Sequence, residues 1–342
     1  MNLSHPLLCS LLELHRKLRT EIVSACATQS TEALAAVAED GEGDTLFAID
    51  KISERVLLAE LGGIANDNGG IVLVAEGIEG GKVCLPRGRV ESRCRYRVIM
   101  DPIDGTRELM YQKRPAWILT GVAPNKGDET ALRDIDLAIQ TEIPLTKQYL
   151  ADELWAVRHR GAHAERVNLH NGERTALPMR PSRATSISQG FAMITRFFPG
   201  ARDELAAIDD ELAYRLLGPC PAGKAHCFED QYLSTGGQLY ELIMGHDRFV
   251  ADLRPLLGPV LAARGLPLGL CCHPYDICTA LIAEELGIVI RSPDGKAPDY
   301  PLNIDANVSW VGYANTHLAH TIEPILRGVL EQRGLLGNRP AH

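Results

Sequence analysis

The chain has 342 residues, enough for two domains or for one large α/β body with a substantial buried core. Its composition, 45% hydrophobic and 23% charged, excludes disordered and fibrous proteins. The net charge of −9 is the opposite of what a protein needs to hold a nucleic acid polymer through its phosphates, so we expect no such partner. A small anionic substrate would need a local positive field, such as bound metal cations.

The beginning of the chain does not have the pattern of a secretory signal, because Lys17 and Arg19 follow its apolar stretch instead of preceding it. No run approaches the roughly 18 apolar residues that a membrane span needs, so we expect no membrane contact. The nine cysteines form no C-x-x-C pair, which disfavours both a disulfide framework and a zinc knuckle. We therefore expect a reduced, cytoplasmic protein.

Hydrophobic periodicity changes along the chain near residue 184. Before that point it predicts two early helices and then short strands, and after it longer helices that alternate with short strands, which is an α/β signature. The expected helices cover 6–28, 44–61, 201–217, 235–245, 276–287 and 316–333, and the expected strands cover 71–74, 96–100, 117–123, 135–141 and 154–157. The polar stretch 158–183 is typical of a loop.

One segment, Val98–Glu108 with the sequence VIMDPIDGTRE, carries most of the chemical information. It has the pattern of an apolar strand that runs into a turn bearing two carboxylates, Asp101 and Asp104. Gly105 permits close backbone approach, and Thr106 is a favoured residue for capping a following helix. Oxygen ligands suit Mg²⁺ and the amides at a helix N-terminus suit phosphate, so one loop could hold both. If this loop is considered alone, the alternative interpretation is an acidic turn that has no catalytic or binding role.

Two further acids stand at the ends of predicted elements. Glu76 closes the strand that precedes the loop, and Asp276, in the sequence HPYD, opens a predicted apolar helix that ends at Gly287. An acid at one helix N-terminus is unremarkable, since it suits the helix dipole, but four acids at element ends favour a function. The patterns of a P-loop, a dinucleotide-binding loop, a serine-hydrolase elbow and a zincin are absent.

Together, the D-P-I-D-G-T core, the upstream glutamate and the late aromatic–Asp pair resemble the inositol monophosphatase family. This family belongs to the Mg²⁺-dependent, lithium-sensitive phosphatases that include fructose bisphosphatases and 3'-phosphoadenosine 5'-phosphate phosphatases. The resemblance covers roughly residues 40 to 330 and includes Asp50 on the second helix and the Ser234–Gly237 start of a later helix. It implies an α/β (α+β) fold, a layered αβαβα sandwich. Its N-terminal half, residues 1–185, would carry the metal loop, and its C-terminal half, residues 186–342, would carry Asp276.

The resemblance also implies a metal site of two Mg²⁺ ions, for which Mn²⁺ could substitute. Glu76, Asp101 and the carbonyl of Ile103 would hold one ion, while Asp101, Asp104 and Asp276 would hold the second. A third, weaker ion beside Glu76 is allowed, although the family usually has a second acid where this chain has Gly77.

The implied reaction is direct attack of water on a phosphomonoester. Thr106, helped by Asp50 and with Glu76 beside the metals, would orient the water, and the amides of Gly105 and Thr106 would bind the phosphate. The chemistry agrees with this, because paired cations activate water and stabilise an in-line displacement. The resemblance further implies a homodimer, as is common in the family.

The alcohol part of the substrate would be read by other groups, for which the candidates are Arg107, Thr235, Asp252 and Arg254. The leading hypothesis is a phosphatase of a small phosphorylated metabolite, a polyol or a sugar. The pair Arg107–Glu108 is closer to the Lys-Glu of the nucleotide bisphosphatases, so a 3'(2'),5'-bisphosphate nucleotidase or sugar bisphosphatase is the alternative. A catalytically inactive member that acts as a binding protein is the alternative from a different class.

Overall fold

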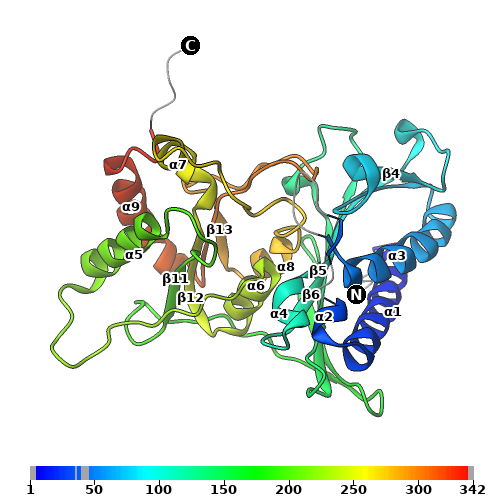
Figure 1. Cartoon of the computed structure of the whole chain (residues 1–342), viewed down its shortest axis with the longest axis horizontal. Helices are drawn as coiled ribbons and strands as arrows, with labels where there is room; N and C mark the ends of the chain where they lie inside the picture. Colours follow the sequence, from blue (N-terminus) through cyan, green and yellow to red (C-terminus); the bar gives the residue numbers. More distant parts are fainter. Residues whose placement is uncertain (1–4, 35–36, 40–45, 338–342) are drawn as a thin grey trace.

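The computed structural model describes residues 5–34, 37–39 and 46–337, with only the backbone at 37–39, 46–48, 50 and 52–54. Two sheets organise this part of the chain, one in each half of the molecule (Figure 1). A short pair, β1 (Val37–Glu39) and β2 (Leu46–Phe47), lies outside them. The change from the first sheet to the second falls between Ala176 and Phe191.

The first sheet has eight strands in the order β10-β9-β8-β7-β6-β5-β3-β4, and all neighbours are antiparallel except β3 and β5. Its central strands are apolar on both sides, as in β3, where all five residues are buried, because helices cover both faces. The strands are β3 (Ile71–Ala75), β4 (Lys82–Leu85), β5 (Tyr96–Asp104), β6 (Ala116–Pro124), β7 (Leu137–Ile143), β8 (Leu150–Val157), β9 (Ala162–Asn168) and β10 (Arg174–Ala176).

The second sheet has four strands in the order β11-β12-β14-β13, with only the pair β11 and β12 parallel. The strands are β11 (Phe191–Ile194), β12 (Asp247–Asp252), β13 (Val289–Arg291) and β14 (Trp310–Tyr313). After β12 the chain forms a 3-10 turn, η4 (Arg254–Leu257), and a short helix, α7 (Gly258–Ala263).

Helices form the other three layers of the molecule (Figure 1). On the outer face of the large sheet lie α1 (Leu8–Thr28) and α3 (Ala48–Asp67), with the short α2 (Thr31–Leu34) beside them. Between the sheets lie α6 (Thr235–Met244) and α8 (Ala280–Glu284), and the outer face of the small sheet is covered by α5 (Arg202–Leu217) and α9 (Thr316–Gln332). The order helix, sheet, helix, sheet, helix confirms the predicted αβαβα sandwich.

The alternation of side chains along the large sheet separates two apolar cores. Along β5, Val98 and Met100 point into the core under α1 and α3, whereas Ile99 points into the core that continues to the small sheet. Among the described residues, no helix is long and apolar enough to cross a membrane. All nine cysteines are free thiols.

Two predictions of secondary structure are wrong. The stretch 158–183 is not all loop, because it contains β9 and the edge strand β10. Their pairing uses charges, such as Arg166 on Asp152 at 2.7 Å and Arg174 on Glu165 at 2.7 Å, so they lack the apolar runs of central strands. The predicted helix 276–287 is also too long, since α8 begins only at Ala280. The predicted helix 44–61 corresponds to α3, and its first two residues lie outside the described part.

Candidate active site

A β-bulge at the end of β5 presents Asp101 and Asp104. Asp101 is paired with Leu119 and Asp104 with Trp117 on β6, so three steps along β5 match two along its neighbour. The carboxylate of Asp101 accepts a hydrogen bond from the backbone N–H of Ile103 at 2.9 Å, which holds the bulge. The carboxylates therefore belong to the strand itself and not to a turn beyond it.

Gly105 makes the sharp change of direction from β5 into the short helix α4 (Thr106–Met110). Its φ of +97° lies in the left-handed region, and a Cβ atom there would come within 3.3 Å of the Cβ of Ser234. The turn brings the hydroxyl of Thr106 onto the carbonyl oxygen of Ile103, to which it donates at 2.7 Å. One turn thus joins Thr106, predicted to orient the water, Gly105, predicted to bind the phosphate, and the carbonyl of Ile103, predicted to bind a metal.

The start of α6 holds Asp104 from the other side. The Oδ2 atom of Asp104 accepts hydrogen bonds from the hydroxyl of Ser234 at 2.8 Å and from the backbone N–H of Gly236 at 2.6 Å. Ser234 also caps α6 by accepting from the N–H of Gly237 at 2.8 Å. A Cβ on Gly236 would lie 3.0 Å from Asp104 Oδ2 and 2.6 Å from a methyl carbon of Leu119, so only glycine permits this approach.

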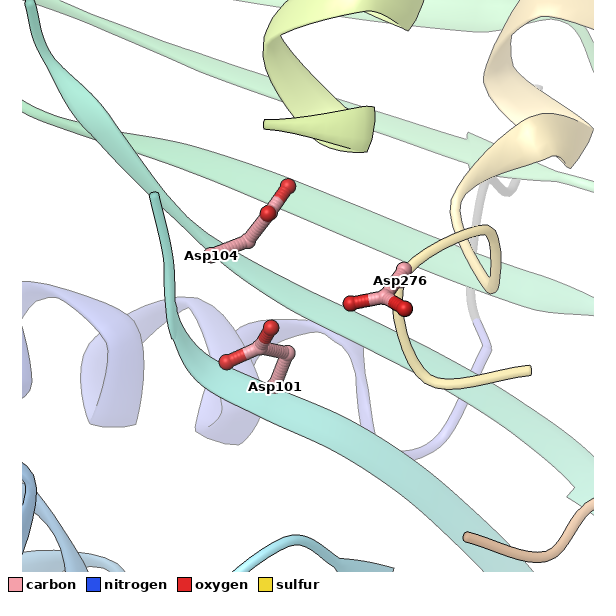
Figure 2. A group of neighbouring side chains, drawn as sticks. All are labelled: Asp101, Asp104 and Asp276. Carbon is pink, nitrogen blue, oxygen red and sulfur yellow. The ribbon is translucent and has the colours of Figure 1, made fainter. Parts of the chain in front are cut away.

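Asp276 completes the cluster from the segment before α8. Its carboxylate accepts from the backbone N–H of His273 at 2.6 Å, and this local turn explains why the helix does not begin at Asp276. One oxygen from each of Asp101, Asp104 and Asp276 lies within 4.8 Å of those of the other two. Figure 2 shows the three side chains converging from β5 and from the loop before α8.

Burial and mutual repulsion make it costly to ionise this cluster. Burial raises the pKa of Asp101 well above its usual value, and the charges of Asp104, Asp276 and Glu76 raise it further. The pKa of Asp104 is raised to about 8, first by burial and then by Asp276, although the bonds from α6 oppose the rise. A divalent cation would relieve this repulsion, and an all-oxygen set suits Mg²⁺ or Mn²⁺. The residues therefore fit the predicted metals.

A cleft opens over the cluster. Most of the predicted site residues line it, namely Glu76, Asp101, Ile103, Asp104, Gly105, Thr106, Arg107, Thr235, Arg254 and Asp276. Asp252 does not line it, because this side chain is buried and binds Arg254 with Nε–Oδ1 at 2.9 Å and Nη2–Oδ2 at 2.5 Å. Asp50 lies on α3, but its side chain is outside the described part of the structure.

Several residues of the cleft were not predicted from the sequence. These are Phe197, Phe198, Leu233, Leu270, Cys271 and His273. The most distinctive is the pair Phe197–Phe198, which follows β11 and stands directly before a Pro-Gly turn in a chain with only six phenylalanines. The two adjacent phenylalanines before this turn are the one feature of the sequence that could have indicated this part of the cleft.

The backbone matches solved phosphatase structures over most of its length. The extragenic suppressor protein suhB of Bartonella henselae is 13% identical with a TM-score of 0.63, covering 94% of this chain and 99% of that one. An inositol monophosphatase (IMPase) of Thermotoga maritima is 16% identical with a TM-score of 0.57, covering 95% and 98%. Fructose-1,6-bisphosphatase of Leishmania major in its holo form is 14% identical with a TM-score of 0.65, covering 94% and 93%.

These matches define the fold as that of the inositol monophosphatase and fructose bisphosphatase group, which confirms the predicted resemblance at the level of the fold. Comparison of the sequence itself with protein-family profiles and with curated proteins gives no match. At sequence identities of 13% to 16%, these matches establish only the fold. The function therefore has to be argued from the residues of the cleft.

Proposed function

We propose that the protein is a metal-dependent phosphomonoesterase that acts on a small phosphorylated metabolite. The observation that carries this proposal is the group of three aspartates within 4.8 Å of one another in a cleft of a phosphatase-type fold. A purely structural role does not account for the cluster, because three buried or half-buried like charges destabilise the folded chain unless a cation joins them.

The cluster offers ligands for two Mg²⁺ ions. Glu76, Asp101 and the carbonyl of Ile103 would hold one, and Asp101, Asp104 and Asp276 would hold the other, with Asp101 shared. When bound, such ions lower the pKa of an attacking water and offset the charge that develops on the phosphoryl oxygens. The hydrogen bonds from the backbone N–H groups of Ile103 and Gly236 hold the carboxylates of Asp101 and Asp104, which supports their proposed role as ligands.

The protein's own groups would position the water and the phosphate. The hydroxyl of Thr106 donates a hydrogen bond to the carbonyl oxygen of Ile103, and we propose that its oxygen accepts one from the attacking water. The left-handed Gly105 aims the first amides of α4 toward the cleft, where they would donate to phosphate oxygens. Asp50 is the further predicted partner of the water.

The charges of the cleft suit a dianionic phosphate once cations are bound. Its lining holds four carboxylates, which belong to Glu76, Asp101, Asp104 and Asp276, and two guanidinium groups, which belong to Arg107 and Arg254. Without cations this balance repels a phosphate, and with two divalent ions it becomes positive. The metals and the amides would contact only the phosphate group. The other residues of the cleft would therefore select among polyol, sugar and nucleotide esters.

Phosphate release by the purified protein tests this function. The substrates would be inositol, sugar and nucleotide phosphates, each assayed with Mg²⁺, with Mn²⁺ and with EDTA. We expect release with either ion and none with EDTA. If no ester is hydrolysed while the same esters bind in the presence of Mg²⁺, the protein is an inactive binding member of this fold and the proposal fails.

A further inference from the structure

The lining of the cleft divides into an acidic part and an apolar part. All four of its acids are the proposed metal ligands. Apart from these, one part of the lining consists of rings and aliphatic groups from Phe197, Phe198, Leu233, Leu270 and Tyr275. Among the side chains that the structure describes, the lining therefore offers no carboxylate beyond the proposed metal ligands to receive the hydroxyl groups of a polyol.

Several of the other polar side chains of the lining bond within the protein. The hydroxyl of Ser234 bonds to Asp104 and to the N–H of Gly237, and the hydroxyl of Tyr275 lies 3.1 Å from Nδ1 of His273. Thr235 contacts the sulfur of Cys272 at 3.8 Å. A hydroxyl-rich ligand would have to compete with these bonds, whereas an apolar group would not.

Arg254 fixes the two phenyl rings. Its guanidinium carbon lies 4.7 Å from the ring centre of Phe197 and 5.2 Å from that of Phe198. The same group is locked onto the carboxylate of Asp252 and donates to the carbonyl of Leu270 at 2.9 Å. It thereby ties together β12, the loop after β11 and the segment 264–271, all of which border the cleft.

The rings also hold each other and the backbone that carries them. Their centres are 4.8 Å apart and their planes meet at 87°, an edge-to-face pair. Arg202, in the first turn of α5, donates to the backbone carbonyls of both phenylalanines at 2.5 Å and 2.8 Å. The aromatic wall, defined as Phe197, Phe198 and Arg254, is thus preorganised and needs no ordering when a ligand arrives.

We propose that the aromatic wall binds a planar unsaturated ring in the alcohol part of the substrate, so that the enzyme prefers aryl or heteroaryl esters to hydroxylated ones. The inference rests on the proposed phosphatase function and assigns its substrate class. A planar ring gains from stacking or edge contact with Phe197 and Phe198 and from the guanidinium plane of Arg254. A saturated ring of the same size gains only from burial of its surface.

Two matched esters isolate this effect. Benzyl phosphate and cyclohexylmethyl phosphate are both esters of primary alcohols with a six-membered ring, and they differ in planarity and in π electrons. The variants are Phe197→Leu and Phe198→Leu, which keep an apolar side chain without the ring. Phe228→Leu is the control, because Phe228 is exposed, pairs with Phe191 and does not line the cleft.

We measure KM and kcat for both esters, and in parallel their binding to the Mg²⁺-loaded protein by calorimetry. The wall predicts that each cleft variant raises KM and the dissociation constant of benzyl phosphate by about three- to tenfold, leaving kcat and the cyclohexylmethyl values within about twofold. Phe228→Leu should change neither ester. Equal effects on both esters, or none, would overturn the inference.

The two readouts separate this inference from the proposed function. If the wild type releases phosphate normally but binds benzyl phosphate no more tightly than cyclohexylmethyl phosphate, only the proposal of the aromatic wall is overturned. Selective binding that depends on Phe197 and Phe198 without any phosphate release would uphold the wall as a ring-binding site and overturn the phosphatase function.

Discussion

Replacing Asp104 with asparagine should stabilise the metal-free protein. The side chain is buried, and its oxygen accepts hydrogen bonds from Ser234 and Gly236, which an asparagine carbonyl can keep. The neighbouring carboxylates of Asp101 and Asp276, whose oxygens approach within 4.8 Å, would then face a neutral amide. The change thus removes one charge from the cluster while preserving shape and bonding.

The size of the effect follows from the raised pKa of Asp104, about 8 against a usual value of 3.8. Between these values the folded chain retains a proton that the unfolded chain has lost, so the stability of the metal-free wild type falls as the pH rises through this window. Each pH unit costs about 1.4 kcal/mol, which gives an upper limit of about 4 kcal/mol at pH 7. Asp104→Asn removes this penalty, and we expect a gain of about 2 to 4 kcal/mol in EDTA.

A thousandfold excess of Mg²⁺ over Kd should cancel or reverse this difference, because only the wild type has the full ligand set and gains about 4.1 kcal/mol from it. Urea unfolding in EDTA and in Mg²⁺, at pH 5, 7 and 9, measures both effects. Asp252→Asn is the contrasting variant, since Asp252 is buried against Arg254 and its loss should cost about 3 kcal/mol in either condition. An Asp104→Asn protein less stable than wild type in EDTA at pH 7 would refute the reasoning.

Three further predictions concern the same cleft. Gly105→Ala should cost about 1 to 2 kcal/mol of stability in urea unfolding because of its φ of +97°, and should abolish phosphate release; a variant of full stability and rate would contradict the role of this turn. Thr106→Ser should keep much of kcat and Thr106→Val should lose it, whereas equal rates would remove the hydroxyl from the water-positioning role. Cys271→Ser and Cys272→Ser should leave Mn²⁺ affinity unchanged, and anomalous scattering from a Mn²⁺-soaked crystal should place no ion on sulfur; an ion bonded to Cys271 would show that the oxygen-only ligand set is wrong.

The metal loop was accessible from the sequence because its geometry is local. An apolar strand, two carboxylates three residues apart and a glycine are all contained in Val98–Glu108, and the structure places both carboxylates in the cleft. The β-bulge was not foreseen, because it depends on the register with β6. Asp276 was also found from its sequence context, although the length of its helix was wrong.

The substrate-facing part was less accessible because it depends on long-range pairing. Asp252 and Arg254 were predicted to face the substrate, but they bind each other, and only Arg254 lines the cleft. The stacking of Arg254 on Phe197 and Phe198 joins segments that no local pattern connects. The strands β9 and β10 were missed for the same reason, since their charge pairs form only between neighbouring strands.

The central claim is that the aspartate cluster holds the metals on which phosphate release depends. Its most direct test is phosphate release by the wild type and by Asp276→Asn, measured against increasing Mg²⁺ on the best substrate of the panel. Asp276 is partly exposed and contributes nothing to either apolar core, so the variant should fold normally. The account predicts a Mg²⁺-dependent rate for the wild type and loss of turnover in the variant at every Mg²⁺ concentration. A variant that reaches nearly the wild-type rate at saturating Mg²⁺ would contradict it.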